Sequence, residues 1–216
     1  MPLINVRTSL PEVADSAALL KELSAALAQQ TGKPESYVMT LLETAVPMTF
    51  AGSSEPCAYV EIKSIGALKP AAVGELSKRQ LGAIDPAAMK GVTGAQFRQI
   101  APADIDALSV AQVSAMQTSV FEAMRPSQAA ELSQRAVGAL EKTQIAALAP
   151  AAVGELSAGQ ISAIDPAAVA GIDAEQIEEI PTELIDEITP EQVAELQPDT
   201  LAGLTDDQLG ELSEDQ

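Results

Sequence analysis

The sequence predicts an α+β N-terminal segment with the order β-α-β-β, followed by a mainly α-helical solenoid built from short repeats. Residues 1–67 show strand and helix patterns of ordinary length, whereas residues 68–216 divide into consecutive octads without a gap. An apolar residue opens every octad and another recurs at its sixth place, and Gln recurs at the fifth place of every other octad. A fixed period sustained over 144 residues, or 18 octads between residues 68 and 211, is typical of a repeat architecture.

The first 67 residues contain three predicted strands and one predicted helix. Pro2–Arg7 has a short strand pattern, Leu10-Pro11-Glu12 opens a helix, and apolar residues at helical spacing continue to a stop at Thr31–Pro34. Further strands are predicted at Tyr37–Leu42 and Ala58–Ile62. A strand, a crossover helix and a parallel strand form a right-handed unit, but one such unit has too small a core to stand alone easily.

Several short motifs occur together in this segment. They are Met1-Pro2, Thr31-Gly32-Lys33-Pro34, Tyr37, the run from Gly52 to Ala58, and Ser64-Ile65-Gly66. With these motifs, residues 1–67 resemble macrophage migration inhibitory factor and its tautomerase superfamily. The resemblance covers only the first of the two β-α-β halves that the family normally has, because the octads begin where the family's second helix is expected.

The resemblance implies a tautomerase reaction and a set of site residues. Removal of Met1 would leave Pro2 as a secondary amine, which would act as general base in keto-enol tautomerisation of a small aromatic keto acid such as phenylpyruvate, or of a dopachrome-type substrate. By resemblance, Lys33 holds the anionic group of the substrate, Ser64 and Ile65 line the pocket, and Tyr37 contacts the substrate. Two alternatives stay open: Lys33 complements the dipole at a helix C-terminus, and Tyr37 packs in a strand.

The sequence also departs from the family. The aromatic and Asn pocket residues of the family's second half have no counterpart, so we expect an exposed Pro2 that stays protonated and gives weak or absent turnover. A β-α-β unit leaves strand edges unpaired and one sheet face uncovered. We therefore expect residues 1–67 to self-associate, as trimers or hexamers, unless the first octads fold back over that sheet.

Each octad predicts one short helix that stops and restarts. In the octad that opens at Ile188, Thr189 has the place of an N-cap, Pro190 that of the first helical residue, and Gln192 completes a capping box. One continuous helix is excluded, because eight residues leave a drift of about 80° per octad and the apolar stripe would face nothing. The same drift excludes a coiled coil. Disorder is opposed by the unbroken apolar columns and the 47% hydrophobic composition.

Successive octads differ in character. The fifth place holds Gln in every other octad from Gln80 to Gln208, whereas the octads between them carry Ala or another residue there and most of the Pro residues. The natural unit is therefore 16 residues, two short helices of different character, and we interpret it as a candidate for one coil of the solenoid.

Charge and composition exclude several classes of function. The net charge is −19, and residues 143–216 carry 17 acidic side chains and no Lys or Arg. Such a surface repels nucleic acid and anionic membranes, and is interpreted either as a solvated face or as a docking surface for a protein partner. With Cys57 as the one cysteine and no His, we expect no disulfide framework, no metal and no cofactor.

The N-terminus has no basic, apolar leader pattern and no apolar run is long enough to span a membrane, so we expect a cytoplasmic protein. A second reading of the whole chain is a non-enzymatic interaction or assembly protein. In that reading the β-α-β unit caps the open end of the solenoid, because a stack of apolar units must end in something polar.

Overall fold

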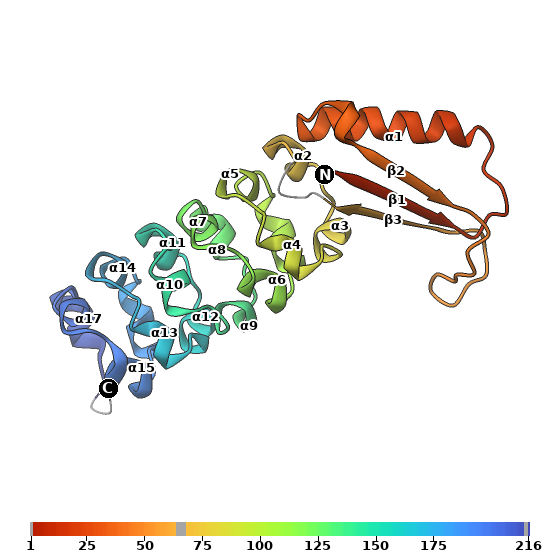
Figure 1. Ribbon diagram of the computed structural model, residues 1–216. Helices are drawn as coiled ribbons and strands as arrows, with labels where there is room; N and C mark the ends of the chain where they lie inside the picture. Colours follow the sequence, from red (N-terminus) through yellow and green to blue (C-terminus); the bar gives the residue numbers. More distant parts are fainter. Residues whose placement is uncertain (1, 64–67, 214–215) are drawn as a thin grey trace. The chain divides into compact units, whose positions relative to one another are not determined.

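The computed structural model describes residues 2–63, 68–213 and 216. The chain forms two compact units, residues 1–72 (unit 1) and residues 73–216 (unit 2). Unit 1 contains β1 (Leu3–Thr8), α1 (Ser16–Thr31), the 3-10 helix η1 (Glu35–Tyr37), β2 (Met39–Glu43) and β3 (Ala58–Lys63) (Figure 1). Among the described residues, no helix is long and apolar enough to cross a membrane.

The sheet of unit 1 has the order β2-β1-β3, with β1 parallel to β2 and antiparallel to β3. The predicted strand, crossover helix and parallel strand are therefore present. Ile4 and Val6 on the central strand β1 form a buried cluster with Leu27 of α1, and Leu42 and Leu68 pack against this cluster. Helix α1 thus covers one face of the sheet over β1 and β2.

Helix α1 begins later than the sequence suggested. The predicted opening at Leu10-Pro11-Glu12 is wrong, because Asp15 accepts a hydrogen bond from the backbone N–H of Ala18 (3.2 Å) and so provides the N-cap. The predicted stop is present: the helix ends at Thr31, and Gly32 follows with φ 67°, a left-handed conformation that glycine adopts without strain.

Apolar side chains are exposed on both edge strands of unit 1. Val60 and Ile62 are each 52% exposed, although they lie opposite Val6 and Ile4 and therefore on the sheet face that carries α1. Helix α1 consequently leaves β3 uncovered. Exposed apolar residues on the other face are Met39, Leu41 and Tyr59.

In the octad region a helical element begins every eighth residue from Pro70 to Asp206. These elements are α2 (Pro70–Gly74), α3 (Lys78–Gly82), α4 (Pro86–Met89), α5 (Gly94–Phe97), η3 (Pro102–Ala107), α6 (Val110–Ser114), α7 (Thr118–Glu122), α8 (Pro126–Ala129), α9 (Gln134–Val137), α10 (Lys142–Ile145), α11 (Pro150–Gly154), α12 (Ala158–Ala163), α13 (Pro166–Val169), α14 (Ala174–Glu178), η4 (Thr182–Glu187), α15 (Pro190–Glu195), α16 (Pro198–Leu201) and α17 (Asp206–Glu211). Unit 2 is thus a solenoid of short helices.

The first and sixth places of the octad form the core of unit 2. Leu156, Ile161, Ile164 and Val169 are each at most 3% exposed. The last described octads differ, because Leu201 and Leu209 have exposed fractions of 39% and 49%. The predicted N-caps are formed as well, for example at Thr189, whose side chain accepts a hydrogen bond from the backbone N–H of Gln192 (3.3 Å).

Each helix of unit 2 packs against the helix that lies three octads away, and this makes three parallel rows. Examples are the row α8, α11 and α14 and the row α6, α9 and α12, which Figure 1 shows side by side along the unit. One coil therefore contains three octads, or 24 residues. The interpretation of a 16-residue pair as one coil is wrong, because a helix packs on the helix three octads away rather than two. Each octad therefore turns the chain through about a third of a full coil. The alternation of Gln gives no information about this angle.

Buried glutamines tie successive coils together. The Oε1 atom of Gln160 accepts a hydrogen bond from the backbone N–H of Ser157 (2.8 Å), and its Nε2 donates to the carbonyls of Ala129 (3.0 Å) and Leu132 (2.7 Å) in the preceding coil. Ala129 is the last residue of α8, and Leu132 opens the next octad, so the amide binds one carbonyl at the end of a helix and one just beyond it. The same paired pattern occurs at Gln112, Gln128, Gln144, Gln176, Gln192 and Gln208.

The alternation of Gln with smaller residues follows from the coil of three octads. Helix α12, which carries Gln160 at the fifth place, packs on α9, which carries Ala136 at the same place. Gln occurs in every second octad, whereas the octads that stack on one another lie three apart. Since three is an odd number, an octad with Gln always stacks on an octad without Gln at the fifth place. Large and small side chains then interdigitate along each row, which is what a close-packed interior requires.

Replacing Gln160 by Ala should lower the free energy of unfolding by about 2–3 kcal/mol, because buried carbonyls and an N-cap N–H lose their partner. Gln117→Ala is the matched control, since Gln117 is exposed and makes no side-chain cap. Chemical denaturation followed by circular dichroism measures both. Equal losses for the two variants would contradict the role of the buried amide.

Deleting 24 residues (132–155), a whole coil, should destabilise the solenoid more than deleting 32 residues (124–155). The shorter deletion puts the Gln160 octad directly after the Gln128 octad and stacks Gln octads on one another, an overpacking that costs about 1–3 kcal/mol. The longer deletion preserves the alternation. The melting temperatures of the two deletion variants measure the difference. A higher melting temperature after the shorter deletion would contradict the rule that Gln octads stack only on octads without Gln.

Candidate functional site

One end of the unit 1 sheet collects the described residues that the sequence predicts for the site. Leu3, the first residue of β1, pairs with Met39 at the start of β2 and with Lys63 at the end of β3. Since β1 and β2 are parallel, the C-terminal end of α1 also lies at this end. Pro2 precedes β1, Lys33 follows α1, and Tyr37 precedes β2. We call this region the Pro2 end.

Pro2 is buried, and its carbonyl accepts a hydrogen bond from the backbone N–H of Met39 (3.0 Å). The exposure expected from the missing second half is therefore not found. Pro2 leads directly into β1, the central strand of the sheet, which has β2 on one side and β3 on the other. An amine buried in this place would hold its proton less tightly than one in water, because burial disfavours the charged form.

Lys33 lies just beyond the C-terminal end of α1 and is exposed. Its backbone N–H donates to Oγ1 of Thr31 (3.4 Å), whose hydroxyl donates in turn to the carbonyl of Leu27 (2.7 Å). No carboxylate among the described residues forms a salt bridge with its ammonium group. The position fits both interpretations of Lys33, an anion-binding group and a cation that complements the helix dipole.

Tyr37 lies in η1 and is 59% exposed. The interpretation of Tyr37 as a residue packed in a strand is therefore wrong, because β2 begins two residues later, at Met39. Its side chain is exposed at the Pro2 end. Ser64 and Ile65, which the resemblance places in the pocket, lie outside the described residues.

The motif from Gly52 to Ala58 lies at the opposite end of the sheet. The carbonyl of Cys57 accepts hydrogen bonds from the backbone N–H of Ser9 and from Oγ1 of Thr8, both 3.0 Å, and the N–H of Cys57 donates to Oγ of Ser9 (2.9 Å). These bonds anchor the loop to the end of β1. The motif thus ties the loop before β3 to the end of β1, and it lies away from the Pro2 end.

Sequence reasoning missed Lys69 as a neighbour of this region. The backbone N–H of Lys69 donates to the carbonyl of Gln30 in α1 (2.7 Å), which brings the first octad against the C-terminal end of that helix. One feature of the sequence could have drawn attention to Lys69. It occupies the second place of its octad, where Ser, Thr or Asp is common, and so departs from the repeat.

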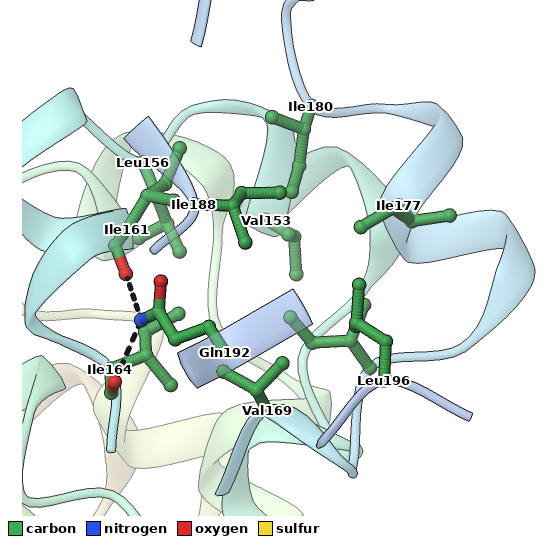
Figure 2. A pocket seen from close by; sticks show the side chains of 11 residues that line it. Val153, Leu156, Ile161, Ile164, Val169, Ile177, Ile180, Ile188, Gln192 and Leu196 are labelled. Carbon is green, nitrogen blue, oxygen red and sulfur yellow. Dashed lines mark hydrogen bonds between the residues drawn. The ribbon is translucent and has the colours of Figure 1, made fainter. Parts of the chain in front are cut away.

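The described residues contain no candidate metal centre, and an enclosed cavity lies in unit 2. Within the described part of the chain, no cluster of three or more His, Cys, Asp or Glu side chains could hold a metal ion. Unit 2 contains an apolar cavity between α11 and α15, lined by residues such as Val153, Ile161 and Gln192 (Figure 2). Its free volume of about 10 Å³ is at the lower limit for one water molecule, so it belongs to the packed core.

Comparisons with known proteins match the N-terminal part of the chain. A sequence model of the family described as macrophage migration inhibitory factor matches residues 1–84. The macrophage migration inhibitory factor homolog of Brugia malayi is 41% identical over 70 residues, which are 32% of this chain and 61% of that protein. The macrophage migration inhibitory factor of Meriones unguiculatus is 41% identical over 78 residues, which are 36% of this chain and 68% of that protein.

A solved structure, that of the macrophage migration inhibitory factor homologue from Prochlorococcus marinus, is 54% identical and covers 37% of this chain and 72% of its own, with a TM-score of 0.31. The chain thus spans about two thirds of the length of the relatives that it matches. The match to the family continues through residue 84 and includes Lys69, beyond the 67 residues that carry the resemblance in sequence motifs. The chain therefore belongs, through its N-terminal segment, to the macrophage migration inhibitory factor family.

Proposed function

We propose that unit 1 catalyses keto-enol tautomerisation of a small aromatic keto acid of the phenylpyruvate type, or of a dopachrome-type substrate, once Met1 has been removed. The observation that carries the proposal is the burial of Pro2 at the same end of the sheet as Lys33 and Tyr37. A general base needs an environment that lowers its affinity for the proton to match neutral pH, and a buried secondary amine has such an environment.

Each residue has one role in this reaction. The Pro2 amine takes a proton from the carbon next to the keto group and returns a proton to the enolate oxygen, so no atom is gained or lost. Lys33 binds the substrate carboxylate through charge-assisted hydrogen bonds, and the exposed ring of Tyr37 packs on the aromatic ring of the substrate. Ser64 and Ile65 line the pocket by family resemblance. Because the aromatic and Asn pocket residues of the family's second half have no counterpart in this sequence, turnover is weak.

Pro2→Gly in the Met1-processed protein should abolish the enol-keto conversion of phenylpyruvate above background, a loss of about 10²–10⁴-fold for a general base. Ultraviolet absorbance of the enol measures the rate, and mass spectrometry verifies removal of Met1. Pro11→Gly is the matched control, since Pro11 lies beyond the other end of β1 and is exposed. Equal rates for Pro2→Gly and the parent protein would contradict the proposed role of Pro2 as general base.

We also propose that unit 1 self-associates, as a trimer or hexamer, through residues 1–67. The support is the exposed apolar surface on both edge strands, where Leu41 is 44%, Tyr59 53% and Val60 52% exposed. Unpaired edges and an uncovered apolar face favour association with another copy.

The double change Val60→Glu and Ile62→Glu should shift the full chain toward monomer, because the new charges would be desolvated in an interface. Light scattering measures the mass. Leu10→Glu is the control, since Leu10 is exposed (40%) but lies outside the strands. A parent chain that is already monomeric, or a mass unchanged by the double substitution, would exclude association through β3.

A second candidate function is that of a non-enzymatic interaction protein whose unit 2 binds a protein partner. The specific observation is that the tautomerase roles leave residues 73–216 unused, while the interior of unit 2 is filled by its own side chains. Any partner would therefore bind on the outer surface, where residues 143–216 carry acidic but no basic side chains. Equal background rates in the Pro2→Gly comparison would favour this second function.

A further inference from the structure

The chain returns to the Pro2 end after β3. Leu68 packs against the buried cluster of Ile4, Val6 and Leu27, and the next residue, Lys69, is held to the carbonyl of Gln30 by its backbone N–H (2.7 Å). An apolar anchor and a backbone hydrogen bond therefore fix where the Lys69 side chain begins.

The side chain of Lys69 runs along the C-terminal end of α1. Its Cε atom is 3.8 Å from the position that a Cβ on Gly32 would occupy. Gly32 directly precedes Lys33, so the two lysines flank one glycine in space although 36 residues separate them in the sequence. A glycine at this position lets the aliphatic stem of Lys69 approach the backbone closely.

Neither ammonium group forms a salt bridge with a described residue, whereas two other cations of unit 1 do: Arg7 with Glu43 (3.2 Å) and Lys63 with Glu61 (3.5 Å). Both Lys33 and Lys69 are exposed. Two neighbouring cations without carboxylate partners among the described residues form a local positive surface, which attracts anions.

We infer that Lys33 and Lys69 together bind a ligand with two acidic groups, so that among aliphatic 2-oxo acids of equal chain length the Pro2 end prefers dicarboxylates over monocarboxylates. The inference rests on the proposed function for the reaction that follows, but the binding preference itself does not need turnover. One lysine binds the carboxylate next to the keto group, and the other binds the distal carboxylate. Each contact is a charge-assisted hydrogen bond, which is about twice as strong as a neutral one.

If Lys69 had a purely structural role, the expected result would differ. Helix α1 has no basic residue in its last turn, and in that role Lys69 would complement the C-terminal dipole of the helix, as Lys33 does in one of its two interpretations. In that case loss of the Lys69 charge would lower the melting temperature and would leave the discrimination between ligands unchanged.

The test compares two ligands of equal chain length, 2-oxoglutarate and 2-oxopentanoate, which differ by the distal carboxylate. Isothermal titration calorimetry on the Met1-processed full chain at low salt measures both dissociation constants. The expected preference for 2-oxoglutarate is about tenfold, the effect of one charge-assisted contact. Lys69→Ala should reduce the preference below about threefold, and Lys69→Arg should restore it. Lys21→Ala, which changes an exposed lysine near the start of α1, should leave it unchanged.

Three results would overturn the inference: no binding of either ligand, equal binding of both by the parent protein, or a preference that survives Lys69→Ala. A fall in melting temperature without a change in preference would assign Lys69 to the helix end alone. If the preference depends on Lys69 but the Pro2→Gly comparison shows no enzymatic rate, the inference holds and the proposed tautomerase function fails. The two proposals are thus tested separately.

Discussion

The two-sided hydrogen bonding of a buried glutamine is the interaction on which unit 2 depends. Its helices are four to six residues long, so nearly every backbone group lies within a turn of a helix end and needs a partner from outside the helix. One Gln side chain provides both kinds of partner. Its oxygen accepts from the N-cap of its own helix. Its nitrogen donates to two carbonyls of the coil before, one in a helix and one at the residue that opens the next octad. In the octads that carry Gln, the cap of the helix and the spacing of the coils are therefore set by the same residue.

This arrangement also explains why substitution of the buried Gln is expected to destabilise unit 2. Gln112, Gln128 and Gln208 are at most 1% exposed, and an unpartnered amide at such depth is strongly unfavourable. A neighbouring coil is thus held at the distance at which both carbonyls are reached. Unit 1 uses a different principle: its sheet has one small cluster on one face, and the chain closes the end of α1 by docking Leu68 and Lys69 there.

Much of the fold followed from local chemistry in the sequence. The capping boxes, as at Thr189 and Gln192, are local patterns that a sequence displays directly. The size of the coil is not local, because it depends on the angle between successive helices, and this angle is set by backbone geometry rather than by the two-octad alternation. For the same reason the burial of Pro2 and the approach of Lys69 to Gly32 were not foreseen: both depend on segments that meet only in the folded chain.

The most direct test of the glutamine account is hydrogen exchange of the side-chain amides, observed by NMR. The account predicts that the amide protons of Gln128, Gln160 and Gln192 exchange as slowly as backbone amides in the core of unit 2, because both kinds become accessible only when the coils separate. The exposed Gln99 and Gln117 should exchange rapidly and serve as internal references. Rapid exchange of the buried amides in a protein whose backbone amides remain protected would contradict the account.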